Sequence, residues 1–397
     1  MTERSHDAEG QLNDLKARAV AEARAMAPEL HALSDRIYHN PELGFSEFKA
    51  SQWLSEFLAS RGFEVELGLA GMDTAFRASA SGASPGGVVA LLAEYDALPE
   101  IGHGCGHNMI GVAACGAAAA VKGVLGELRG TVLVYGCPAE EGAVLGAGGK
   151  VVLVSRGYFD GVDAAMMIHP ASRFVVSSRS LARAALKMVF SGGDAQSAAM
   201  LTFNAINALR QHLGLGARVH GVIGADNGPG VRADRAPEHC EVRAYVRAYE
   251  TADLEDCEER VRDCALGAAM ATGCQVDFAH TSPTYEEMVT NQELASAFTA
   301  NLKALGVVVE EGLDAGTGST DMGNVSHVTP SLHAYVATCP RGVAGHTREF
   351  GRATLTQGAH ESMLTGVEAL AMTVIDLLGN PSLLSRVRTE FERTVRI

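Results

Sequence analysis

Residues 86–107, GGVVALLAEYDALPEIGHGCGH, join a strand-like apolar run to a glycine-rich segment that carries chemically reactive side chains. The first nine residues, 86–94, are rich in Val, Leu and Ala at successive positions, as expected for a strand buried on both faces. Asp96 follows directly, and Cys105 and His107 come a few residues later. Ligands bind at the carboxyl ends of strands in open α/β sheets, so this stretch predicts a buried strand that leads into a ligand site.

Two later apolar runs end in similar side chains. Residues 131–137 (TVLVYGC) precede the acidic pair Glu140-Glu141. Residues 164–168 (AAMMI) precede His169. Stretches with apolar residues at helical spacing lie between and around these runs, at residues 12–39, 49–61, 113–128, 150–156 and 354–378. Strands that alternate with helices predict an α/β domain, in which helices flank a mixed, mainly parallel sheet.

The pattern changes near residue 180. Residues 182–190 and 240–248 alternate apolar with polar side chains, which is typical of a sheet covered on one face only. We therefore predict a small α+β domain at residues 182–292, inserted into a discontinuous domain made of residues 1–181 and 293–397. The strand at 240–248 could be a sheet edge that pairs across a two-fold axis.

Composition and charge exclude several classes of partner. The 397 residues are 47% hydrophobic and 20% charged, which is typical of a globular chain. A net charge of −15 and the lack of a Lys/Arg cluster argue against nucleic acid. The apolar runs break before the roughly 20 residues that span a bilayer, so no membrane partner is expected. The start of the chain lacks a secretory pattern, and the eight Cys form no CxxC pair, which favours a cytoplasmic location.

The glycine-rich segment predicts a metal site. Thiolate and imidazole groups bind divalent cations, and the surrounding glycines allow a tight bend that could turn Cys105 and His107 toward one ion. His103 could support the site or simply lie in the loop. Asp96 could orient a ligand imidazole or begin a turn before Pro99, and the sequence leaves both readings open.

The acidic pair and the remaining histidines extend this prediction. Adjacent carboxylates at a strand end diverge, so one of Glu140 and Glu141 could bind a metal while the other acts as a base toward water. A solvated acidic pair is the alternative. His169 repeats the placement at a strand end, although a core His bonded to the backbone competes with this interpretation. His346 lies far away in sequence and has weaker local support.

Together these segments resemble the M20 family of metallopeptidases and amidohydrolases, and within it subfamily D, the aminoacylase-like and aminobenzoyl-glutamate-hydrolase-like group. The matching stretches occur in the family's order along nearly the whole chain. They are HNPELGF (39–45), LLAEYDALP (91–99), GHGCGHN (102–108), PAEEG (138–142), MMIHP (166–170), RVHG (218–221), GSTDMGNVSH (318–327) and AGHTREF (344–350). The resemblance implies a catalytic α/β domain split by an inserted lid and dimerisation domain.

The resemblance also implies roles for individual residues. Glu140 becomes the general base, which would deprotonate a metal-activated water and pass the proton to the leaving amine. The ion would be Mn²⁺ or Zn²⁺, with one or two ions per site, and the inserted domain would form a homodimer. The metal ligands implied are Cys105, His107, Glu141, His169 and His346.

Two departures from the family pattern bear on the substrate. The lid His of the family's G-K-x-x-H-A stretch, which stabilises an oxyanion, is replaced here by Gln196. Losing one such donor can cost about 3 kcal/mol of transition-state stabilisation, and His220 could substitute. The family's N-x-I-P motif is replaced by a stretch that begins at Asp234, which would repel a substrate carboxylate unless Arg232 or Arg235 faces inward.

Three functions follow from these patterns. The leading hypothesis is hydrolysis of an amide or other C–N bond in a small molecule, such as an N-acyl or N-aminoacyl amino acid, a dipeptide or an aryl amide. The second is hydrolytic deamination of an electron-poor aminoarene with release of ammonia, because a ring carbon generates no carbonyl oxyanion for the absent lid His. The third is a non-catalytic binding protein on the same fold.

Overall fold

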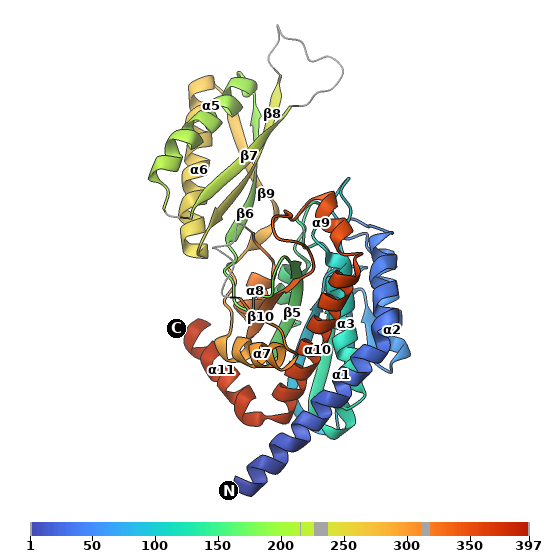
Figure 1. The fold of residues 1–397 in the computed structure, drawn as a ribbon. Helices are drawn as coiled ribbons and strands as arrows, with labels where there is room; N and C mark the ends of the chain where they lie inside the picture. The colour runs from blue at the N-terminus through green and yellow to red at the C-terminus, as the bar shows by residue number, and fades with distance from the viewer. Residues whose placement is uncertain (1, 215, 226–236, 311–317, 396–397) are drawn as a thin grey trace. The chain divides into compact units, whose positions relative to one another are not determined.

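The apolar run that begins at Gly86 lies in the strand β3 (Ser84–Ala93), and the last five residues of this strand are fully buried. The computed structural model describes residues 2–214, 216–225, 237–310 and 318–395 (Figure 1). The chain divides into a larger unit and a smaller unit. The larger unit consists of Met1–Arg179, Val289–Ala315 and Asn324–Ile397, and the smaller one of Ser180–Met288 and Gly316–Gly323. The smaller unit overlaps the predicted insertion at 182–292 and adds a short glycine-rich segment.

The larger unit is built on a six-stranded sheet with the order β1-β2-β4-β3-β5-β10. β4, β3, β5 and β10 run parallel, whereas β1 and β2 are antiparallel to their neighbours. The mixed, mainly parallel sheet predicted from the sequence is therefore confirmed. The other strands are β1 (Glu64–Leu67), β2 (Phe76–Ser81), β4 (Arg129–Gly136), β5 (Ala164–Ala171) and β10 (Ser331–Ala337).

Helices α3 and α10 pack against the sheet, and α1 packs against both of these helices (Figure 1). Every residue of α3 from His107 to Val121 is buried, and most of them are small. A Cβ at Gly116 would lie 2.9 Å from Leu30 of α1, so this close approach depends on small residues. The helices are α1 (Thr2–Tyr38), α2 (Phe48–Ser60), α3 (His107–Lys122), α4 (Gly149–Ser155), α7 (Gln292–Ala304), α8 (Met322–Ser326), α9 (Arg348–Ala353), α10 (Gln357–Gly379) and α11 (Pro381–Val395).

Helix α10 is, among the described residues, the one helix long and apolar enough to meet the criteria for a membrane span. Of its most apolar window, 72% is buried inside the protein, as in the core helix of a folded domain. The sequence prediction that no membrane partner is expected rests on other apolar runs, which did not include α10.

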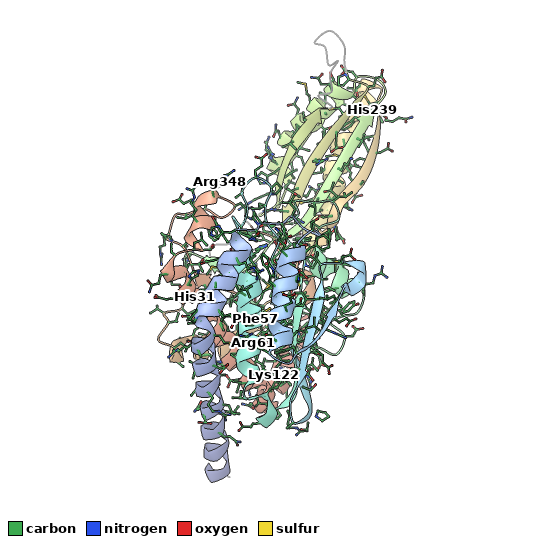
Figure 2. The ribbon with its side chains drawn as sticks, turned by 90° about the vertical axis from the view of Figure 1, so that its right-hand side faces the viewer. His31, Phe57, Arg61, Lys122, His239 and Arg348 are labelled. Atoms are coloured by element: carbon green, nitrogen blue, oxygen red, sulfur yellow. The ribbon has the colours of Figure 1, made fainter. Side chains whose placement is uncertain are left out.

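Side chains at the C-terminal end of α2 link this helix to the middle of α1. The guanidinium of Arg61 lies over the ring of Phe57, 3.7 Å from its centroid, and pairs with Glu29 of α1 (Figure 2). This contact ties the end of α2 to α1.

Several predicted element bounds in the larger unit were wrong. Helix α3 begins at His107 and not near residue 113, because the helix continues through Gly111 back to the left-handed turn at Gly106. Strand β5 continues to Ala171, so His169 lies within the strand and not after it. The predicted helix at 354–378 begins three residues later, at Gln357, because Thr356 caps the start of α10 by accepting a hydrogen bond from the backbone of Ala359.

The smaller unit has a four-stranded antiparallel sheet with the order β7-β8-β6-β9. Helices α5 and α6 pack on one face of it, which explains the alternating burial along β8. The prediction that residues 240–248 form an edge was wrong, because β8 lies between β7 and β6. The elements are β6 (Ala182–Ser191), α5 (Ala195–Leu209), β7 (Arg218–Ala225), β8 (His239–Ala248), α6 (Thr251–Thr272) and β9 (Gln275–Tyr285).

Candidate metal centre

A left-handed turn at Gly106 places Cys105 and His107 at the start of α3. Gly106 has φ of 82°, and a Cβ there would lie 2.7 Å from Pro170, so only glycine fits. His107 is the first residue of the helix and is fully buried. The Sγ atom of Cys105 lies 3.4 Å from Nε2 of His169. The turn thus directs two donors from one segment toward a third donor on β5.

Asp96 fixes the orientation of the His107 ring. The Nδ1 atom of His107 lies 2.8 Å from Oδ1 of Asp96, a hydrogen bond in which protonated Nδ1 donates. The other carboxylate oxygen of Asp96 accepts from the backbone N–H of Glu141 at 3.0 Å. Nε2 of His107 is buried and has no hydrogen-bond partner among the described residues. This geometry fits the orienting role of Asp96, because it leaves Nε2 available to a metal.

The acidic pair that follows β4 faces the same point. Oε2 of Glu140 and Oε1 of Glu141 lie 3.9 Å and 3.8 Å from Nε2 of His107. Ala139, just before the pair, has a positive φ of 56°, and its N–H donates to Oε1 of Glu47 at 2.9 Å. Buried Glu47 also accepts from the hydroxyl of Thr74 at 2.8 Å. A carboxylate from the HNPELGF region thereby holds the backbone that presents the acidic pair.

The two remaining histidines complete the cluster from different elements. Nδ1 of His169 lies 2.8 Å from the carbonyl oxygen of Pro170, which leaves Nε2 to face Cys105. His346 lies before α9, and its N–H donates to the carbonyl of Gly104 at 2.9 Å. Its Nε2 atom lies 3.3 Å from Oε2 of Glu141, and the side chain is 59% exposed. The cluster is therefore buried on one side and exposed at His346.

These residues fit a divalent cation. Three overlapping groups have their ligand atoms within 4.8 Å of one another: Cys105-His107-His169, Cys105-Glu141-His346 and Glu94-His107-Glu140. Sulfur, imidazole and carboxylate are the donors that Zn²⁺ and Mn²⁺ accept. All five ligands implied by the sequence resemblance lie in these groups.

Burial alters the acid–base properties of the cluster. Desolvation raises the pKa of Glu141 to about 7 and lowers the pKa of His169 to about 3. Burial, followed by the charge of Glu141, raises the pKa of the Cys105 thiol. Each shift opposes the ionised form, and a bound cation is what would stabilise the anionic thiolate and carboxylate.

Three residues beside the donor cluster escaped the sequence reasoning. Glu94 ends the apolar run and belongs to one of the ligand groups, and Lys150 pairs with it. His333 of β10 packs against His169, with ring centroids 5.4 Å apart. A charged residue at the end of an apolar, buried stretch was the available signal for Glu94. Its pairing with Lys150 left no such signal, because the two residues lie far apart in sequence.

The residues considered for substrate contacts lie elsewhere in the chain. Gln196 is in the first turn of α5 and His220 is on β7, and both side chains are exposed in the smaller unit. Arg232, Asp234 and Arg235 lie outside the described residues.

Comparison with known proteins places this chain in a family. Residues 90–375 match the Peptidase family M20/M25/M40. The chain is 36% identical to the Xaa-Arg dipeptidase of Mus musculus, over 96% of this chain and 93% of that protein. It is 29% identical to one of the subunits of the p-aminobenzoyl-glutamate hydrolase of Escherichia coli, over 91% of each chain. A dinuclear metal-binding M20 peptidase of Bacillus subtilis shares the fold, with TM-score 0.66 and 20% identity over 89% of this chain and 99% of that one.

The donor cluster and these relatives define a metal-dependent hydrolase that acts on C–N bonds in small molecules. The chain belongs to the M20/M25/M40 peptidase family, which confirms the resemblance seen in the sequence motifs.

Substitution of Gly106 tests how the turn builds the centre. Gly106→Ala adds a Cβ that meets Pro170 and should cost about 1–3 kcal/mol of unfolding free energy, in addition to about 1–2 kcal/mol for the left-handed backbone. Gly102→Ala is the matched control, since its φ is 77° and its nearest contacts are 3.7 Å away. Urea unfolding measures the loss of stability in each variant, and metal titration measures metal affinity. We expect metal affinity to be lost in Gly106→Ala alone. Equal metal affinity in both variants would argue against the turn's role.

Glu47 should make stability depend on pH. Desolvation, and then the charge of Asp96, raise the Glu47 pKa from 4.5 to about 7. The folded state therefore binds more protons than the unfolded state between these values, and stability falls as pH rises through this range. We expect the unfolding free energy of metal-free Glu47→Gln, relative to wild type, to increase from pH 5 to pH 8. Exposed Glu349→Gln serves as the control, and a pH-independent difference for Glu47→Gln would contradict the assignment.

Proposed function

We propose that the protein hydrolyses the amide bond of a dipeptide, an N-acyl or N-aminoacyl amino acid, or an aryl amide. The observation that carries this proposal is the cluster of ligand atoms around Nε2 of His107, with Glu140 beside it. The names of two relatives, a dipeptidase and an aminobenzoyl-glutamate hydrolase, both describe amide cleavage and support the same bond type.

Glu140 is suited to proton transfer in this reaction. Its carboxylate is only 9% exposed and lies next to the donor cluster. A bound divalent cation would polarise the carbonyl and lower the pKa of water. Glu140 would then accept a proton from the attacking water as its oxygen bonds to the carbonyl carbon. It would return that proton to the amine nitrogen as the C–N bond breaks.

The ligand set supports Mn²⁺ or Zn²⁺ as the ion, since both accept mixed sulfur, nitrogen and oxygen donors. The dinuclear relative of Bacillus subtilis supports two ions per site. A homodimer formed through the smaller unit and a cytoplasmic location are part of the same proposal. The antiparallel sheet offers β7 and β9 as edges for such a dimer.

A second candidate is hydrolytic deamination of an electron-poor aminoarene. It is favoured by Gln196, whose neutral amide stands where the family pattern has a positively chargeable His. An oxyanion on a carbonyl needs strong stabilisation, whereas attack on a ring carbon that carries an amino group places no oxyanion there. Release of ammonia without acyl cleavage would identify this reaction.

Glu140→Gln tests the proposed general base. The variant should lose about 10²- to 10⁴-fold in kcat, because proton transfer by a positioned carboxylate contributes on that scale. Amine release should be measured on a panel of dipeptides, N-acyl amino acids, aryl amides and aminoarenes, with metal content determined in parallel. Metal content should stay at the wild-type level.

Glu349→Gln is the matched control, because Glu349 is exposed and lies three residues from His346. It should keep wild-type activity. Unchanged kcat in Glu140→Gln at full metal loading would refute the role of Glu140. A wild-type enzyme that releases no amine from any amide, at full loading, would refute the amide proposal.

A further inference from the structure

A buried ion pair lies behind the metal centre. Nζ of Lys150 lies 2.6 Å from Oε1 of Glu94, and the two side chains are 0% and 1% exposed. The other oxygen of Glu94, Oε2, lies 3.5 Å from Nε2 of His107. One carboxylate thus connects a fully buried lysine to the ring nitrogen that the metal would use.

The two residues of the pair come from two segments next to the donor cluster. Glu94 follows β3, two residues before Asp96, and Lys150 is the second residue of α4. The start of α4 is fastened to the acidic-pair loop, because the N–H of Gly148 donates to the carbonyl of Ala139 at 2.7 Å. Lys150 therefore reaches Glu94 from a helix whose start is hydrogen-bonded to the loop that presents Glu140.

Stability alone is a poor explanation for such a pair. Taking two charges out of water carries a large desolvation cost for each ion, and replacing a buried pair by apolar side chains is often neutral or stabilising. A second pair in the same unit, Lys16 with Asp376 at 2.5 Å, keeps partial contact with solvent and lies away from the donor groups. The full burial of the Glu94 pair beside His107 calls for a role at the centre.

We propose that Glu94 and Lys150 form a positioning pair for the metal centre. Lys150 holds Oε1, and this fixes Oε2 toward Nε2 of His107 and the ion bound there. Glu94 thereby adds a carboxylate to the environment of the ion beyond the five ligands that the family motifs supply. This inference rests on the metal-dependent function proposed above, but metal affinity tests it separately from activity.

The decisive variant is Glu94→Met/Lys150→Met, which removes both charges and leaves neither one unpaired. Binding of Mn²⁺ and Zn²⁺ to the metal-free protein should be measured by calorimetry. We expect affinity to fall about 10- to 100-fold, the scale seen when residues that support metal ligands are lost. The absorption spectrum of the Co²⁺-loaded variant should also shift, because the coordination of His107 changes.

Lys16→Met/Asp376→Met is the matched control and should keep wild-type affinity and spectrum. Glu94→Asp is the companion variant. It keeps the negative charge opposite Lys150, while its shorter side chain withdraws the carboxylate from His107. The metal affinity of this variant should also fall. If both Glu94 variants bind each ion within twofold of wild type and give the same Co²⁺ spectrum, the pair is only structural. Lost affinity with a panel that shows no hydrolysis would support the pair and refute the amide reaction.

Discussion

The structure depends on a concentration of buried donors around one imidazole nitrogen. Cys105, Glu140 and Glu141 gather around Nε2 of His107, where desolvation disfavours the ionised forms of Cys105 and Glu141. A divalent cation would resolve this conflict, because it would stabilise thiolate and carboxylate together and accept the imidazole nitrogen as a ligand. The orienting hydrogen bond from His107 to Asp96 makes that nitrogen available.

The sheet explains how distant segments meet at one point. β4, β3 and β5 are adjacent and parallel, so the groups at their carboxyl ends share one edge. The acidic pair follows β4, Asp96 follows β3 and His169 lies near the end of β5. His346 comes from the segment before α9, and its backbone N–H donates to the carbonyl of Gly104. The order of the strands thus brings these side chains together at one edge of the sheet.

Much of this arrangement could be predicted from sequence, because buried parallel strands leave long apolar runs that end in polar groups. The runs before Asp96, Glu140 and His169 located three of the strands and the donors beside them. Their motifs, recognised as a family pattern, supplied His346, which local sequence did not indicate. The antiparallel strands β1 and β2 left weaker signals, since they are short and partly exposed.

Other features could not be read from sequence for physical reasons. The pairing of Glu94 with Lys150 joins residues 56 positions apart, and either residue alone resembles a surface charge. The position of β8 inside its sheet depends on β7, whose RVHGVIGA stretch has little of the apolar run that marks a buried strand. Nothing in the sequence singled out Glu47, yet its carboxylate accepts a hydrogen bond from Ala139 in the loop of the acidic pair.

X-ray absorption spectroscopy of the purified, Zn²⁺-loaded protein tests the central claim most directly. A sulfur neighbour at about 2.3 Å from the ion, together with nitrogen and oxygen neighbours, is the predicted result. The sulfur signal should vanish in Cys105→Ser. An ion with oxygen and nitrogen neighbours alone in the wild-type protein, or a protein that takes up no ion, would contradict the account.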